Sequence, residues 1–350
     1  MTRTPRKDIL ATEEVGLFHC TQRCVRRAWL CGEDPYSGKN YDHRKVLIRE
    51  RLEELASIMA IDVCSYSVMV NHIHVILRNR PDIVKTWSDE EVARRWWRLF
   101  PKRRNKDRSP AEPDEHELGM LLADKKALQE RRERLSSISW FMRCLAEVIA
   151  RKANVEDQTT GRFWQGRFKC QPLLDDAAIL ACSAYVDLNP VRASVCQSPE
   201  ESEFTSACDR IHSRLARQGK KPKKRYRFAI TPRDNWLAPL ELKGEAGPDV
   251  CATGKRASNK GFLTMKLEDY LNLLDWTGRQ VAQGKRGKIP AEFAPLLERV
   301  GLSGDLWVDM VVDFKKWFRS VAGMPSTLRQ EADRRGQTRF NLGAAFPSSL

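Results

Sequence analysis

Short apolar runs and one helical stripe alternate along the first 80 residues. Val15–Leu30 and Asp62–Met69 contain runs typical of strands, and Arg44–Ala60 between them places Val, Leu and Ile at helical spacing. Ser67–Leu77 reads SVMVNHIHVIL, in which two apolar runs flank a polar centre with the turn former Asn71. The pattern predicts a strand, a helix and a tight β-hairpin, complete by about residue 79.

The pattern changes after the hairpin. Arg80–Arg134 is heavily charged, with three Trp near its start and a Pro-bearing basic segment in the middle. It predicts an insertion of two surface helices, Asp89–Phe100 and His116–Arg134, joined by a mobile loop. Ser136–Ala153 restores a helical apolar stripe and predicts the second core helix.

Aromatic and basic residues alternate in Gly161–Asp175, which reads GRFWQGRFKCQPLLD. Aromatic residues are common in strands, and aromatic faces between cations also suit stacked bases and phosphates, so two interpretations stay open. Asp175–Val191 then predicts a helix, with Asp175 or Asp176 as its N-cap. The Asn189-Pro190 pair ends it, because a residue before proline is pushed out of the helical region.

The order strand, helix, strand, strand, helix, strand and one added helix predicts an α+β fold. We expect a ferredoxin-like antiparallel sheet with helices on one face, which leaves the other face available to a ligand. Amphipathic segments near the C-terminus predict a small α-helical domain: Leu267–Val281, Ile289–Val300 and Trp307–Val321. The expected domains are 1–216, with the insertion at about 80–134, a basic linker at 217–260, and a helical domain at 261–350.

Charge and cysteine content narrow the function classes. Lys and Arg outnumber Asp and Glu by 61 to 46, for a net charge of +15, and such a balance attracts polyanions. The cationic run at Arg217–Arg227 indicates a linker, an arm on a polyanion, or solvated charge. No stretch reaches the roughly 18 apolar residues of a membrane span, and no signal sequence opens the chain, so we expect a cytoplasmic protein. The trio Cys20, Cys24 and Cys31 lacks CxxC spacing, which favours buried thiols over zinc.

The candidate metal ligands lie in the hairpin. His72 and His74 are two residues apart, so on a strand both imidazoles share one face while Ile73 points into apolar packing. Two imidazoles on a rigid strand suit a divalent metal, although buried histidines also occur as hydrogen-bonded core residues. Downstream, Tyr185 and Asn189 are four residues apart on the predicted helix and therefore share a face.

In combination these features resemble the HUH single-tyrosine transposases, and among them the REP-associated tyrosine transposases. Four stretches carry the resemblance, in the family's order: GLFHCTQR at Gly16–Arg23, MVNHIHVIL at Met69–Leu77, GRFWQGRFK at Gly161–Lys169 and AYVDLNPVRASV at Ala184–Val195. The sequence departs from the family at Val70, where a proline often precedes Asn-His. The charged insertion and the C-terminal domain also exceed the minimal family fold.

The resemblance implies a function and a site. His72 and His74 would be metal ligands for Mg²⁺ or Mn²⁺, Asn189 would be the third ligand, and Tyr185 would be the nucleophile. The implied reaction is cleavage of single-stranded, hairpin-containing DNA through a 5′-phosphotyrosine, which conserves bond energy for strand transfer. A homodimer is implied as well. The metal would polarise a phosphate oxygen, and phenol, with a pKa near 10, needs activation before it attacks.

Basic and aromatic residues are the candidates for DNA contact: Arg23, Arg26, Arg27, Phe163, Trp164, Arg167 and Lys169. His19, on the first strand, is a candidate to face the site, to pack or to contact a phosphate. Three other functions remain open. They are a DNA-binding regulator with an inactive site, a metal phosphodiesterase in which water attacks, and an RNA-binding module that leaves the histidines without a role.

Overall fold

The computed structural model describes residues 13–25, 29–220, 233–244, 247–282, 290–337 and 340. Its centre is an antiparallel sheet with the strand order β2-β3-β1-β4. The strands are β1 (Gly16–Arg23), β2 (Ile61–Val68), β3 (His72–Asn79) and β4 (Lys169–Leu173). With α1 (His43–Ile58) and α6 (Ile138–Glu156) they follow the predicted order strand, helix, strand, strand, helix, strand.

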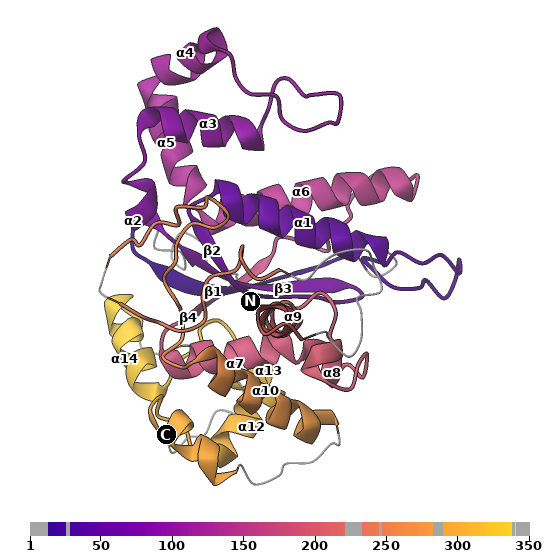
Figure 1. Cartoon of the computed structure of the whole chain (residues 1–350), viewed down its shortest axis with the longest axis vertical. Helices are drawn as coiled ribbons and strands as arrows, with labels where there is room; N and C mark the ends of the chain where they lie inside the picture. The colour runs from indigo at the N-terminus through magenta and orange to yellow at the C-terminus, as the bar shows by residue number, and fades with distance from the viewer. Residues whose placement is uncertain are drawn as a thin grey trace.

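Helices α1 and α6 cover one face of the sheet (Figure 1). Side chains from alternate strand positions, such as Phe18, Val75 and Leu77, pack with them in one buried cluster. Both helices confirm the apolar stripes seen in the sequence, with ends shifted by at most three residues. The strand predicted to continue to Leu30 ends earlier, at Arg23.

Helices also cover the other face, so the expectation of helices on one face alone is wrong. There α7 (Asp176–Asp187) packs against β2 and β3, and α9 (Ser206–Arg217) packs against β2. The physical reason lies in α7, whose residues from Ala177 to Asp187 are all buried. A helix that is apolar on every side must be covered on every side.

The sheet covers one side of α7, and the C-terminal helices also pack against this helix. They are α10 (Leu267–Ala282), α11 (Ala294–Glu298), α12 (Gly304–Val312), α13 (Phe314–Trp317) and α14 (Pro325–Arg334). Leucines of α10, Trp307 of α12 and Phe314 of α13 belong to one apolar cluster with Ile76 of β3 and Leu173 of β4. Each predicted C-terminal segment therefore contains helix and shares a core with the sheet, but the single helix expected at Trp307–Val321 is two, α12 and α13, the second ending at Trp317. The domain boundaries themselves stay a prediction.

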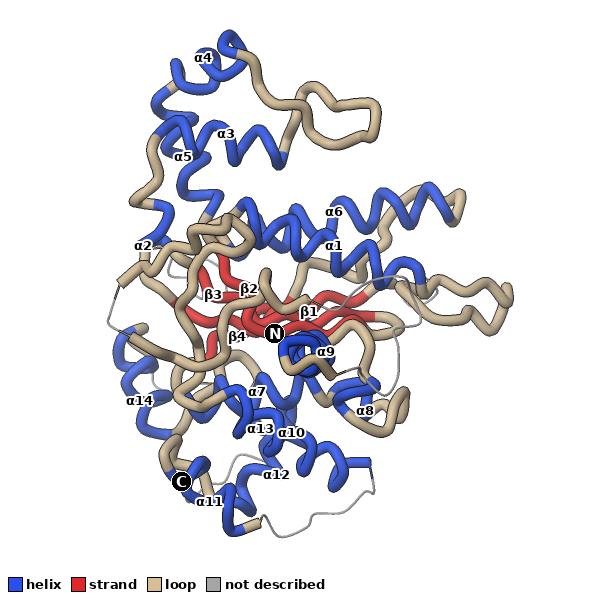
Figure 2. Tube along the Cα trace, viewed as in Figure 1, coloured by secondary structure: helices blue, strands red, loops and turns tan. Residues whose placement is uncertain are grey.

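The charged insertion lies beyond α1 and α6, on the side of the sheet away from α7 (Figure 2). It contains α2 (Pro81–Val84), α3 (Asp89–Leu99), α4 (Glu115–Ala123) and α5 (Lys125–Leu135). The single helix expected at His116–Arg134 is two helices, because the Asp124 side chain accepts a hydrogen bond from the Ala127 backbone and begins a new one. No described helix is long and apolar enough to cross a membrane.

The end of α7 follows the sequence prediction closely. The Asp175 side chain accepts a hydrogen bond from Ala178 N–H and caps the helix, as expected. At Leu188 the helix ends, and the Asn189-Pro190 pair begins a short separate turn, α8 (Asn189–Arg192). Most of the basic run at 217–227 lies outside the described residues.

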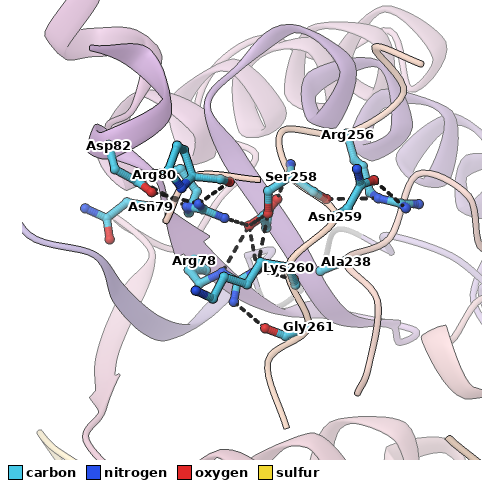
Figure 3. Close-up of polar contacts among 12 residues, drawn as sticks. Arg78, Asn79, Arg80, Asp82, Ala238, Arg256, Ser258, Asn259, Lys260 and Gly261 are labelled. Atoms are coloured by element: carbon cyan, nitrogen blue, oxygen red, sulfur yellow. Dashed lines mark hydrogen bonds and ion pairs between the residues drawn. The ribbon is translucent and has the colours of Figure 1, made fainter. Parts of the chain in front are cut away.

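A buried ionic network fastens residues 256–261 to the edge of the sheet (Figure 3). Asp62 of β2 is fully buried and accepts hydrogen bonds from Arg78, at 2.8 and 3.0 Å, and from the Ser258 backbone and hydroxyl. Arg78 also donates to the carbonyl oxygens of Lys260 and Gly261. These bonds satisfy the charges that folding removes from water.

Candidate functional site

Three histidines meet on the sheet face that α7 covers. β1 and β3 are neighbours with Thr21 opposite His74, which puts His19, His72 and His74 on the same side. The ring centroids of His72 and His74 are 4.8 Å apart, and those of His19 and His74 are 5.1 Å apart. The structure thus brings the predicted pair together and places His19 beside it, the first of its three proposed positions.

A chain of hydrogen bonds fixes the tautomer of His74. The Gln171 amide nitrogen donates to the Arg319 carbonyl at 3.3 Å, so its oxygen is the atom that faces His19 Nδ1 at 3.5 Å. His19 must then donate from Nδ1, and its Nε2 accepts from His74 Nδ1 at 2.8 Å. This leaves a lone pair on Nε2 of His74. That atom is buried and has no hydrogen-bond partner within the described part of the chain.

His72 has the same tautomer as His74. Its Nδ1 lies 2.7 Å from the side-chain oxygen of Asn71, an acceptor, so Nδ1 carries the proton and Nε2 keeps a lone pair. Burial lowers the pKa of His72 to about 4, with a smaller contribution from Lys315. Burial also lowers the pKa of His19 to about 4 and that of His74 well below its usual value. At neutral pH all three are uncharged imidazoles, the form that binds metals.

These shifted pKa values make the protein sensitive to acid. The unfolded chain takes up protons on these histidines near pH 6.5, whereas folded His19 and His72 do so only near 4. We therefore expect full stability above about pH 6.5 and a falling free energy of unfolding from there toward pH 4. Thermal melts across this range should show a smaller acid loss in His19→Gln than in the wild type. His116→Gln, at an exposed histidine, should change nothing.

Tyr185 comes from α7 and lies against the histidines. Its ring centroid is 5.6 Å from that of His74 and 6.0 Å from that of His19, both edge-on. Phe314 of α13 stacks on the ring at 5.3 Å, and the Arg192 guanidinium lies 4.6 Å from the ring centre. The hydroxyl forms no hydrogen bond to a described residue. The predicted juxtaposition of tyrosine and histidines is present, but the side chain is only 3% exposed.

Asn189, the third predicted ligand, begins α8 one turn after Tyr185. It is 8% exposed, and its amide nitrogen is buried with no hydrogen-bond partner among the described residues. That atom is a donor, so it is the side-chain oxygen that would have to bind a metal. Within the described ranges, no group of three or more His, Cys, Asp or Glu side chains could hold a metal.

A basic pocket of about 510 Å³ opens beside His72. Four cationic side chains line it: Arg23 of β1, Arg167, Lys169 of β4 and Lys315 of α13. All four are exposed, and none forms an ion pair with a described residue. Unpaired cations around a hollow attract anions such as phosphates. Three of them are predicted DNA contacts, and the fourth, Lys315, was not predicted.

Two of the predicted DNA contacts are largely buried. Phe163 and Trp164 are 3% and 8% exposed and belong to the core under α6, where the Trp164 indole donates to the Ala146 carbonyl. Burial favours the packing interpretation, while both rings also line a pocket of about 820 Å³, so base stacking stays a prediction. Arg26 and Arg27 lie outside the described residues.

The comparisons with known proteins give one distant likeness. No protein-family model matches the chain, and no curated protein matches it. A solved structure of a REP-associated tyrosine transposase bound to a REP hairpin has a TM-score of 0.33 and 11% identity. The likeness covers 62% of this chain and 90% of the other. At this level it carries no argument about function, which must come from the site.

Proposed function

We propose that this protein is a metal-dependent nuclease and strand transferase of the HUH type, acting on single-stranded, hairpin-containing DNA through Tyr185. One observation carries the proposal. The Tyr185 ring lies against His74, the His74 ring lies against His72, and the Nε2 atom of each of these two histidines keeps a lone pair beside a pocket of cations without ion pairs to described residues. A buried histidine with a purely structural role would form hydrogen bonds to protein partners with both ring nitrogens.

His72 and His74 suit a divalent metal, which they would bind through Nε2. The family resemblance adds the side-chain oxygen of Asn189, and two imidazoles with one carbonyl oxygen are a donor set for Mn²⁺ or Mg²⁺. The Asn71 oxygen and the Gln171-His19 pair hold the two rings in the tautomers that this needs. When bound, such a metal polarises a phosphate oxygen.

The protein residues would then have distinct tasks. Arg23, Arg167 and Lys169 hold the DNA backbone in the basic pocket. The phenolic oxygen of Tyr185 forms a bond to phosphorus, and the bond from phosphorus to the 3′-oxygen breaks. The phenol loses its proton and the leaving oxygen gains one, so the products are a 5′-phosphotyrosine and a 3′-hydroxyl. The adduct retains the ester bond, which allows rejoining without ATP.

The burial of Tyr185 supports a second candidate function. With 3% of the side chain exposed beneath Phe314, a phosphate has little access to the phenol unless α13 moves. A DNA-binding regulator of the same fold, with no covalent chemistry, would need no such movement. Both candidates use the basic pocket, so binding alone does not separate them.

The test is a search for the covalent intermediate. Labelled single-stranded hairpin DNA is incubated with the protein and Mn²⁺, denatured, and run on a gel. The proposal expects a protein-linked DNA band that chelator abolishes and that mass spectrometry maps to Tyr185. Cleavage without linkage would indicate water attack instead. Binding without cleavage would establish the regulator.

Metal binding can be measured without DNA. We expect Mn²⁺ at about 100 times its dissociation constant to add about 2.7 kcal/mol to the free energy of unfolding, seen as a rise in melting temperature. His72→Ala should abolish the rise, whereas His116→Ala, at an exposed histidine, should keep it. An equal rise in the His72 variant would place the metal elsewhere.

A further inference from the structure

Of the described C-terminal helices, α13 places side chains against Tyr185 and the basic pocket. Phe314 stacks on Tyr185, and α13 and α7 pack together. The next residue, Lys315, places its ammonium nitrogen 5.7 Å from the centre of the Tyr185 ring. Lys315 also lines the basic pocket together with His72 and Arg23. It therefore lies between the tyrosine and the pocket.

The surroundings of Lys315 are those of a ligand-binding cation. It has no ion-pair partner among the described residues, and the charged side chains that share its pocket are all positive. Its neighbour Lys316 differs, because its ammonium is 2.9 Å from the Asp313 carboxylate. Holding four like charges around one hollow is unfavourable until an anion enters.

We propose that Lys315 binds a backbone phosphate of single-stranded DNA in the pocket beside His72, so that a residue outside the predicted nuclease domain completes the substrate site. This rests on the proposed binding of single-stranded DNA and extends it to α13. The position of Lys315 beside the Tyr185 ring places the bound phosphate next to the candidate nucleophile. Arg23, Arg167 and Lys169 contact the same stretch of backbone from the sheet side.

The test measures equilibrium binding of a fluorescent single-stranded oligonucleotide over a series of salt concentrations. Lys315→Gln should weaken binding about tenfold at low salt, and the slope of log K against log salt should fall by about 0.7, the value for one phosphate contact on a single strand. Lys315→Arg should restore both. Lys316→Gln is the matched control, because it removes the same charge one residue away.

Three outcomes would overturn the proposal. One is an unchanged affinity and slope in Lys315→Gln, and another is an equal loss in Lys316→Gln, which would indicate a general charge effect. The third is a loss of affinity accompanied by a lower melting temperature that Lys315→Arg does not reverse. The measurement is independent of the covalent reaction. A protein that binds DNA through Lys315 but forms no adduct would refute the nuclease and retain this inference.

Discussion

Tyr185→Phe should lose the protein-linked DNA band completely, a reduction of at least about 10³-fold, while the protein stays folded and still binds DNA. The reason is chemical, since the substitution removes one oxygen, the atom proposed to attack phosphorus. The structural cost is small. The hydroxyl has no hydrogen-bond partner among the described residues, and phenylalanine keeps the stacking on Phe314 and the edge contact with His74. The measurement is the denaturing gel with labelled DNA.

The matched control is Tyr36→Phe. Tyr36 is 93% exposed and lies in a loop, so this change removes the same atom from a tyrosine that any reagent can reach. The band should be unaffected. A band that persists in Tyr185→Phe would refute the nucleophile, and loss of the band in Tyr36→Phe as well would show that the loss is not specific to Tyr185.

The sheet and the shared face of His72 and His74 could be predicted from the sequence, because both follow from residues that are close together in the chain. Alternation along a strand puts His72 and His74 on one face whatever the rest of the chain does. Apolar stripes define α1 and α6, and an aspartate caps α7, so these elements also follow from residues close in sequence. The closeness of Tyr185 to His74 came from a family resemblance, because the two are 111 residues apart.

Contacts that depend on tertiary packing were not predictable. Lys315 lies in an ordinary amphipathic segment with a second lysine beside it, and only the packing of α13 on α7 shows which of the two faces the site. Gln171 gives no signal until Arg319 fixes its amide. Phe163 and Trp164 alternate with cations, a pattern equally typical of a base platform and of a core. Burial of both rings favours the core, and burial depends on the whole fold.

Asp62→Ala should be the most destabilising change away from the site. Arg78 and Arg80 both direct guanidinium groups at this fully buried carboxylate, at 2.8 and 3.3 Å. Removing it leaves two buried positive charges without their common partner and takes the acceptor from Ser258. We expect a loss of about 3–5 kcal/mol in the free energy of unfolding, measured by urea denaturation. Asp62→Asn, which keeps acceptor capacity but not charge, should lose less.

Asp82→Ala provides the control for charge alone. Asp82 also pairs with Arg80, at 2.7 Å, but its side chain is 31% exposed, and without it Arg80 keeps Asp62 and the Pro248 carbonyl as partners. Its loss should cost about 1 kcal/mol or less. Both aspartates are partners of the same arginine, and they differ in burial and in the further bonds of Asp62 to Arg78 and Ser258. Equal effects of the two substitutions would show that the Asp62 network does not fasten residues 256–261 to the sheet, and that the apolar contacts of this edge do so instead.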